Sequence, residues 1–147
     1  GVMSKTAVIY WSATGNTKLM AEHIRKGIAE TNTDVSLFTA GEFGNKNPDD
    51  YAKIAFGCPS MGNEVLEENE LEPFFASIEH LLPNKPVALF GSYGWGDGEW
   101  MRNWEERVRK SGAILFEQGM TVNLGPDKSD LVQCAEFGRR FAEFNTK

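Results

Sequence analysis

Hydrophobic residues along the chain follow two alternating patterns. Continuous apolar runs, typical of strands that are buried on both faces, lie at 5–10 and 53–57, and further apolar runs that also predict strands, some of them with polar residues, lie at 35–39, 86–90 and 114–123. The last of these runs contains Gly119, where the strand can be interrupted. Between the runs, apolar residues recur three and four positions apart, which predicts helices over 16–30, 69–82, 99–111 and 129–144. Segments rich in Gly, Pro, Asn and Asp predict a loop at 41–50 and a turn at 124–127.

Strands and helices alternate from one end of the chain to the other. This order predicts an α/β fold in which right-handed crossovers place helices on both faces of a parallel sheet. Five strands in 147 residues fit a doubly wound sheet of strand order 2-1-3-4-5. The length predicts a single domain over 1–147. Gly1 and Val2, which precede Met3, are expected to be an added remnant that is not part of the fold.

The composition suits a compact domain and disfavours several classes of partner. Hydrophobic residues make up 41% of the chain and aromatic residues 12%, which is too apolar for a disordered segment. With 15 basic and 21 acidic residues the net charge is −6, which disfavours nucleic acids and anionic membranes and favours basic protein surfaces. No apolar run reaches the ~20 residues of a membrane span and no signal peptide is visible, so we expect a cytoplasmic protein. Cys58 and Cys134 lack metal-ligand spacing and are expected to be buried thiols in a reducing compartment.

The candidate chemistry lies in loops that follow three of the predicted strands. In an open parallel sheet, ligands bind beyond the carboxyl ends of the strands, where the strand order reverses. The first, third and fourth strands end at that edge and continue into 11–17, 59–68 and 92–98. Each loop is rich in Gly, Ser, Asn or aromatic residues, and the three together therefore predict a binding site.

The loop Ser12–Thr17 stands between a predicted strand and a predicted helix. Free backbone N–H groups and the helix dipole at such a turn favour an anion, and the loop adds three hydroxyls and one amide without any Lys or Arg. We predict a monoester phosphate there; the alternative is that Ser12, Thr14 or Asn16 simply caps the helix. The loop lacks the Gly-Lys-Ser/Thr of an ATP site and the repeated glycines of a dinucleotide fingerprint, which disfavours ATP and NAD.

The other two loops carry groups that suit a flat ligand. Tyr93 and Trp95 stand among glycines, which let a backbone approach a ring closely and leave an aromatic side chain free to stack on it; alternatively, Trp95 belongs to the core. Both residues of Gly62-Asn63 tolerate positive φ, so the peptide bond between them can flip at low cost. Met61 suits either a ring face or the core, and Glu64 either accepts a hydrogen bond from a ligand N–H or is solvated.

The three loops, in this order, resemble those of the flavodoxins, in particular the short-chain flavodoxins of anaerobic bacteria, and the resemblance covers nearly the whole chain. Ser12-Ala13-Thr14-Gly15-Asn16-Thr17 is similar to the family's loop for the phosphate of flavin mononucleotide (FMN), while 60–67 and 91–98 are similar to the loops beside the inner and outer flavin faces. The resemblance implies cofactor-binding residues at Trp11, Ser12, Ala13, Thr14, Gly15, Asn16, Thr17, Pro59, Ser60, Met61, Gly62, Asn63, Glu64, Ser92, Tyr93, Gly94, Trp95, Gly96 and Asp97.

The resemblance implies a carrier that moves one electron at a time at low potential, using the semiquinone and hydroquinone of bound FMN. Trp95 would stack on the outer flavin face, Met61 would lie by the inner one, and Glu64 would accept the flavin N3–H. The Gly62 carbonyl would turn toward the N5–H of the reduced flavin and stabilise the neutral semiquinone. Two departures bear on the potential, because Asn63 stands where short-chain members often have Asp and no acidic residue directly precedes Pro126.

Acidic residues crowd 64–72 and 97–99, where they would disfavour the hydroquinone anion and steer basic redox partners to the flavin edge in transient contacts. The alternative is an ordinary solvated acidic face. An NAD(P)H-dependent flavin or quinone reductase is the alternative function, but Trp95 would block a nicotinamide over the flavin and the chain has no spare length. A phosphoacceptor receiver domain needs acidic residues where Trp11 and Cys58-Pro59 stand. The resemblance therefore implies a monomeric electron carrier rather than an enzyme.

Overall fold

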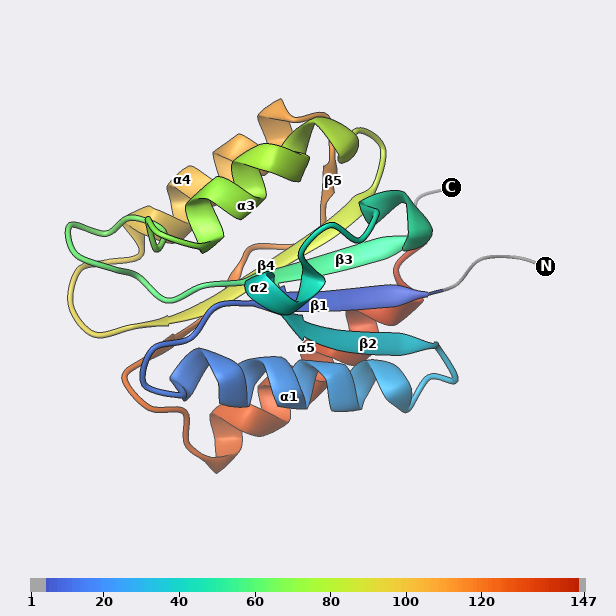
Figure 1. Ribbon diagram of the computed structural model, residues 1–147. Helices are drawn as coiled ribbons and strands as arrows, with labels where there is room; N and C mark the ends of the chain where they lie inside the picture. The colour runs from blue at the N-terminus through green and yellow to red at the C-terminus, as the bar shows by residue number, and fades with distance from the viewer. Residues whose placement is uncertain (1–4, 146–147) are drawn as a thin grey trace.

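The computed structural model describes residues 5–145, so that Gly1 and Val2, the expected remnant, lie outside the described residues. A central sheet is enclosed by two layers of helices (Figure 1). The elements follow the chain in the order β1 (Thr6–Tyr10), α1 (Asn16–Ala29), β2 (Val35–Thr39), α2 (Ala40–Phe43), a 3₁₀ turn (Pro48–Asp50), β3 (Lys53–Gly57), α3 (Leu71–Ile78), a 3₁₀ turn (Glu79–Leu81), β4 (Pro86–Tyr93), α4 (Glu99–Lys110), β5 (Ile114–Leu115), β6 (Met120–Asn123) and α5 (Lys128–Glu143).

The strands pair in the order β2-β1-β3-β4-β5, and every pairing along this path is parallel, which confirms the predicted doubly wound sheet. The predicted fifth strand is broken between Leu115 and Met120, and its second part, β6, also pairs with β4. This pairing covers Phe90 to Tyr93 and extends β4 beyond the residue at which the sequence pattern ended it. The ends of β4 and β6 therefore lie side by side.

Two hydrophobic cores lie on the two faces of the sheet. Side chains of α1 and α5 pack with Val8, Ala55 and Phe90 on one face, and those of α2, α3 and α4 pack with Ile9, Phe56 and Leu89 on the other. Alternate residues of one strand thus serve opposite cores, as expected for a strand without polar positions. Cys58 and Cys134 are both free and buried, which confirms the prediction of two buried thiols.

The layer of α1 and α5 is packed backbone against backbone. Gly27 of α1 faces the Ala135 carbonyl of α5, and a Cβ atom at position 27 would lie 1.8 Å from that oxygen. Gly138 of α5 faces the Ile24 carbonyl in the same way, with a corresponding distance of 2.2 Å. Neither position has room for a side chain, so the two glycines allow the close approach of the helices.

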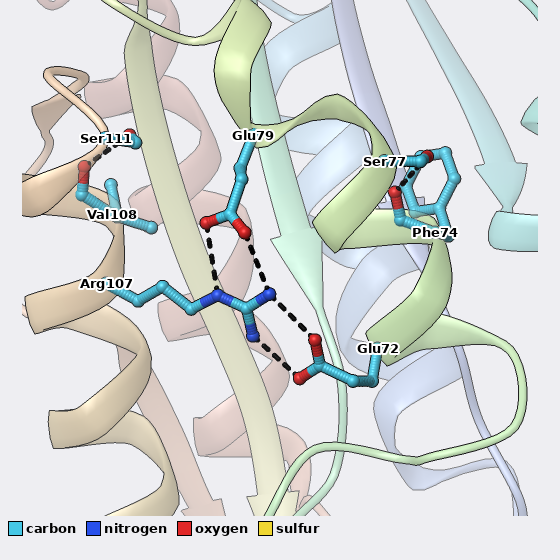
Figure 2. A network of polar contacts seen from close by, with 7 residues as sticks. All are labelled: Glu72, Phe74, Ser77, Glu79, Arg107, Val108 and Ser111. Atoms are coloured by element: carbon cyan, nitrogen blue, oxygen red, sulfur yellow. Dashed lines mark hydrogen bonds and ion pairs between the residues drawn. The ribbon is translucent and has the colours of Figure 1, made fainter.

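The layer of α3 and α4 is held by charged groups at its outer edge. Arg107 of α4 donates to both carboxylate oxygens of Glu72 at 2.7 Å and to those of Glu79 at 3.0 and 3.1 Å (Figure 2). The guanidinium also lies over the Phe75 ring, 4.9 Å from its centroid. The hydrogen bonds to Glu72 and Glu79 raise the pKa of Arg107 above its usual range, although burial acts in the opposite direction, so that it carries its charge at every accessible pH.

The main departures from the predicted elements lie in two segments. The segment 41–50 was predicted as a loop, which is wrong in part: Ala40–Phe43 forms a short helix and Pro48–Asp50 a 3₁₀ turn. A reciprocal capping box stabilises this helix, because Thr39 Oγ1 accepts the Glu42 N–H and Glu42 Oε1 accepts the Thr39 N–H. The helix predicted over 69–82 is shorter at both ends and finishes in a 3₁₀ turn. Within residues 5–145, no helix is long and apolar enough to cross a membrane.

Candidate cofactor site

A pocket with a volume of about 240 Å³ opens at the carboxyl ends of β1, β3 and β4, where the sequence pattern predicts the site. Residues of three predicted loops meet there, joined by one residue from the turn after β6. The lining consists of Ser12, Ala13, Thr14, Asn16, Thr17, Pro59, Ser60, Met61, Ser92, Tyr93, Gly94 and Leu124. Segments that are far apart in the sequence thus form one hollow.

The loop between β1 and α1 presents backbone N–H groups at the start of the helix. Gly15 takes the position before α1 with a φ of 104°, a conformation that glycine adopts without strain. Ser12 Oγ accepts hydrogen bonds from the N–H groups of Gly15 at 3.2 Å and Lys18 at 3.3 Å, so this hydroxyl partly caps the helix. Among residues 5–145, no acceptor is found for the N–H groups of Ala13, Thr14 or Asn16. These donors and the helix dipole suit an anion.

Thr17 ties this loop to the loop after β4. Its side chain is 1% exposed, and its Oγ1 lies 3.0 Å from Ser92 Oγ, with which it shares a hydrogen bond. The Ser92 N–H also donates to Thr17 Oγ1 at 3.4 Å. The loop 12–17 and the loop 92–98 are therefore fixed relative to each other by two buried side chains that line the pocket.

The loop after β3 forms the second wall of the pocket. Met61 and Val65 exchange two backbone hydrogen bonds of 2.9 Å, which close a tight turn. Gly62 and Glu64 in this turn have φ values of 50° and 57°. The Ser60 N–H donates to the Ser92 carbonyl at 2.9 Å and anchors the start of the loop on β4. Met61 lines the pocket, while Gly62 and Asn63 are exposed beside it.

Glu64 does not line the pocket; its carboxylate caps helix α4. Glu64 Oε1 accepts the N–H groups of Gly98 at 3.1 Å and Glu99 at 2.9 Å. Gly96 packs so closely on this carboxylate that a Cβ there would lie 2.4 Å from the Glu64 carboxyl carbon. The sequence offered a ligand hydrogen bond or solvation for Glu64, and the structure adds a third role, the N-terminus of α4.

The third loop leaves Trp95 in an exposed position. The side chain of Trp95 is 66% exposed, which excludes the alternative that it belongs to the core. The Leu124 N–H donates to the Tyr93 carbonyl at 2.7 Å, and Asn123 Nδ2 donates to the carbonyls of Tyr93 and Gly94 at 3.3 and 3.4 Å. The residues after β6 therefore support the backbone next to Trp95.

Sequence reasoning missed Leu124 as a pocket residue. It is 61% exposed, lines the pocket and has a φ of 64°. The signal was its place in the turn after the last strand, at the same sheet edge as the other three loops. The pattern gave a turn there, but nothing in the sequence showed that β6 pairs with the end of β4 and so brings this turn to the pocket.

Several acidic residues in or near the loops 59–68 and 92–98 form ion pairs with arginines of the same chain. Asp97 pairs with Arg102 at 2.9 Å, and the hydrogen bond from that guanidinium, with its charge, lowers the pKa of the Asp97 carboxyl. Glu72 pairs with Arg107 at 2.7 Å. The negative charge of the acidic face is therefore smaller than its number of acidic residues suggests, because Arg102 and Arg107 balance part of it.

Comparison with known proteins now decides the family. Residues 8–138 match the family model described as flavodoxin, which is most of the chain. The chain belongs to the flavodoxin family. The flavodoxin of Clostridium beijerinckii is 44% identical over 135 residues, covering 92% of this chain and 97% of the relative, and that of Megasphaera elsdenii is 41% identical over 139 residues. The solution structure of two-electron reduced Megasphaera elsdenii flavodoxin superposes with a TM-score of 0.82 at 40% identity, covering 95% of this chain and 99% of that one.

The residues implied by flavodoxin resemblance divide into two groups in the structure. The residues of the first group line the pocket: Ser12, Ala13, Thr14, Asn16, Thr17, Pro59, Ser60, Met61, Ser92, Tyr93 and Gly94. The others lie around it or behind it and do not line it: Trp11, Gly15, Gly62, Asn63, Glu64, Trp95, Gly96 and Asp97. Trp11 packs against the core on the side of α3 and α4.

The residues present suit FMN, the cofactor of this family. The N–H groups of Ala13, Thr14 and Asn16, which have no acceptor among residues 5–145, suit the phosphate, and no basic side chain stands within 12–17. The wall residues Met61, Tyr93 and Leu124 offer apolar surface to a flat ring, and the exposed Trp95 stands next to that wall.

Proposed function

We propose that this chain is an electron carrier that holds FMN in the pocket, with the phosphate in the loop Ser12–Thr17 and the ring between the 60–64 and 92–97 loops. The observation that carries the proposal is the meeting of free backbone donors and apolar walls in one pocket, in a chain of the flavodoxin family. Bound FMN supplies the chemistry, since its ring system takes up and releases electrons, and the protein binds and orients it.

Each loop has its own part in the proposed site. The N–H groups of Ala13, Thr14 and Asn16 and the hydroxyls of Ser12 and Thr14 bind the phosphate. Met61 packs on the inner face of the ring and Trp95 on the outer face, where 66% of its surface is available. Glu64 has its Oε1 occupied by α4, so its Oε2 is the oxygen that we assign to the ring N3–H. The Gly62 carbonyl, in a turn with positive φ, is the group that we assign to the ring N5.

Absorption spectroscopy tests this proposal. The purified protein, after incubation with FMN and removal of the excess, is expected to show flavin bands that co-elute with the protein. Stepwise reduction is expected to proceed in two separate one-electron stages. A protein that retains no FMN, or one that is reduced in a single two-electron stage, would contradict the proposal.

We further propose that the carrier has no substrate of its own. Trp95 covers the position that a nicotinamide would need over the ring in a reductase, and its loop is supported by the contacts of Asn123 and Leu124. The FMN-loaded protein is therefore expected to leave NADPH unoxidised when incubated with quinone or free FMN. Steady NADPH consumption by the pure protein would identify a reductase instead.

The proposed partners are redox proteins with basic surfaces, which bind transiently at the edge that carries Val65, Trp95 and Leu124. These apolar residues are 43%, 66% and 61% exposed, and Glu68 and Glu99, which follow Val65 and Trp95 closely in the sequence, are exposed as well. We also propose a monomer in the cytoplasm, which two free buried thiols support, because a reducing compartment keeps such thiols unpaired. Transfer rates that do not fall with rising salt would contradict the charge-steered contact.

A further inference from the structure

The second wall of the pocket depends on a glutamate that lies outside the pocket. Glu67 is 5% exposed and stands between the Met61–Val65 turn and helix α3. Its Oε1 accepts the N–H groups of Glu70 at 2.7 Å and Leu71 at 2.9 Å, and its Oε2 accepts the Asn69 N–H at 2.8 Å. Both oxygens are therefore engaged by backbone donors at the start of α3.

The backbone of Glu67 is fixed as well. Its N–H donates to Cys58 Sγ at 3.4 Å, and Cys58 Sγ in turn donates to the Pro59 carbonyl at 3.4 Å. The loop thus returns to the end of β3, from which it started. A buried carboxylate is costly unless it is hydrogen-bonded, so the 67–71 turn is held in one conformation as long as the charge is present.

These contacts define how the Met61–Val65 turn is held. At its start, the Ser60 N–H is bonded to the Ser92 carbonyl of β4. At its end, Glu67 bonds it to α3. The turn itself contains two residues of positive φ and is closed by the two hydrogen bonds between Met61 and Val65. Its position against the pocket is therefore set by these two attachments, together with the Glu64 carboxylate on the start of α4, and not by burial, since Gly62, Asn63 and Val65 are exposed.

We propose that Glu67 is a positioning residue of the cofactor site: it acts through the start of α3 to fix the Met61–Val65 turn against the ring without touching the cofactor. This inference rests on the proposed function for the cofactor's place, but the state of the turn can be measured without any cofactor. The neighbouring Glu68 is exposed and accepts no hydrogen bond from a described residue, so it differs from Glu67 in position and not in charge.

Three variants separate position from charge. Glu67→Gln removes the charge and turns an amide N–H₂ toward backbone donors, so at least one of the three bonds is lost. Glu67→Asp keeps the charge but is one methylene too short to reach the same donors. Glu68→Gln is the matched control, since it removes the same charge one residue away. Should Glu67→Gln fail to fold, as judged by amide protection in β1 and β3, Glu67→Asp carries the test.

The first measurement is amide hydrogen exchange in the FMN-free protein. Loss of the charge-assisted bonds is expected to speed exchange at the Met61 and Val65 amides by about tenfold or more in both Glu67 variants, with β1 and β3 unchanged. The Glu68→Gln protein is expected to exchange like wild type. Unchanged protection at Met61 and Val65 in the Glu67 variants would overturn the proposal.

The second measurement is FMN binding in the oxidised and reduced states. Both Glu67 variants are expected to bind oxidised FMN about tenfold more weakly, and the ratio of the affinities for oxidised and fully reduced FMN is expected to change by up to about tenfold, which shifts the two-electron midpoint potential by up to about 30 mV. Equal effects of Glu67→Gln and Glu68→Gln, with none for Glu67→Asp, would show a charge effect and overturn the positioning role. If the wild-type protein binds no FMN, the proposed function fails, and the exchange experiment still decides the role of Glu67.

Discussion

The two helical layers on either side of the sheet are held by different interactions. The layer of α1 and α5 relies on close backbone contact, because Gly27 and Gly138 leave no space for a side chain between the helices. The layer of α3 and α4 relies on charged groups, because Arg107 joins the two helices through Glu72 and Glu79. One layer is fixed by shape, the other by hydrogen-bonded charges at its edge.

This difference corresponds to the parts of the site that each layer carries. Helix α1 presents the loop proposed for the phosphate, a group that keeps its charge throughout electron transfer and needs one fixed set of donors. Helices α3 and α4 begin at the loops beside the ring, and Glu67 and Glu64 connect those loops to the two helix starts. We therefore assign binding of the cofactor's phosphate to one side of the sheet and control of the ring's reduction potential to the other.

The largest expected effect on stability comes from one methyl group in the α1 and α5 layer. Gly27→Ala would place Cβ 1.8 Å from the Ala135 carbonyl, and we expect the helices to separate at a cost of about 2–3 kcal/mol in the free energy of unfolding, measured by urea titration. The matched change Gly41→Ala, where Thr39 Oγ1 is 4.0 Å away, is expected to be neutral or stabilising by up to about 1 kcal/mol. Equal outcomes for the two variants would show that close backbone contact does not hold this layer.

A smaller loss is expected from the charged contact in the other layer. Arg107→Met keeps the apolar stem over Phe75 and removes the bonds to Glu72 and Glu79, which are partly buried, so we expect a loss of about 1–2 kcal/mol by the same method. The control Arg109→Met removes an exposed guanidinium with one contact of 3.7 Å and is expected to change stability by less than about 0.5 kcal/mol. Similar values for both arginines would mean that the Arg107 contacts add nothing to the layer.

Trp95→Ala is expected to affect the cofactor and not the fold. Because the side chain is 66% exposed, the free energy of unfolding of the FMN-free protein should stay within about 0.5 kcal/mol of the wild-type value. The loss of stacking should weaken FMN about tenfold, measured by quenching of flavin fluorescence. Val132→Ala, which truncates a 58% exposed apolar residue on α5, serves as the control and should leave affinity unchanged. Unaltered FMN affinity in the Trp95 variant would refute the stacking role.

The last prediction concerns the pH dependence of stability that a buried thiol of the α1 and α5 layer introduces. Burial raises the pKa of Cys134 from 9.0 to about 12. As the pH rises above 9.0 the unfolded thiol loses its proton first, so this group stabilises the fold fully below pH 9.0 and progressively less up to about pH 12. The stability difference between wild type and Cys134→Ala should therefore shift in favour of the variant from pH 8 to pH 11. A constant difference would show that the thiol ionises equally in both states.

Much of the fold and the pocket could be predicted, because both depend on local patterns. Continuous apolar runs located β1 and β3, and the hydroxyl-rich turn before Asn16 located the loop proposed for the phosphate. The short helix after Thr39 was missed, although Thr39 and Glu42 form a capping box with the expected spacing. Its Gly, Asn and Pro neighbours indicated a loop more strongly.

The parts that could not be predicted depend on contacts between distant segments. Glu64 meets the start of α4 more than thirty residues further along, and a carboxylate in a loop looks the same in the sequence whether it caps a distant helix or faces solvent. Glu67 likewise looks like one more member of an acidic run, yet it is buried. Leu124 reaches the pocket only because β6 pairs with the end of β4.

The most direct test of the division between binding and tuning is a comparison of FMN with riboflavin, which lacks the phosphate. Both ligands would be titrated into the FMN-free protein while flavin fluorescence is followed. The N–H groups at the start of α1 predict that FMN binds at least about a hundredfold more tightly, since several charge-assisted hydrogen bonds are lost without the phosphate. Equal affinities for FMN and riboflavin would contradict the assignment of the loop Ser12–Thr17 to the phosphate, and with it the account of the site.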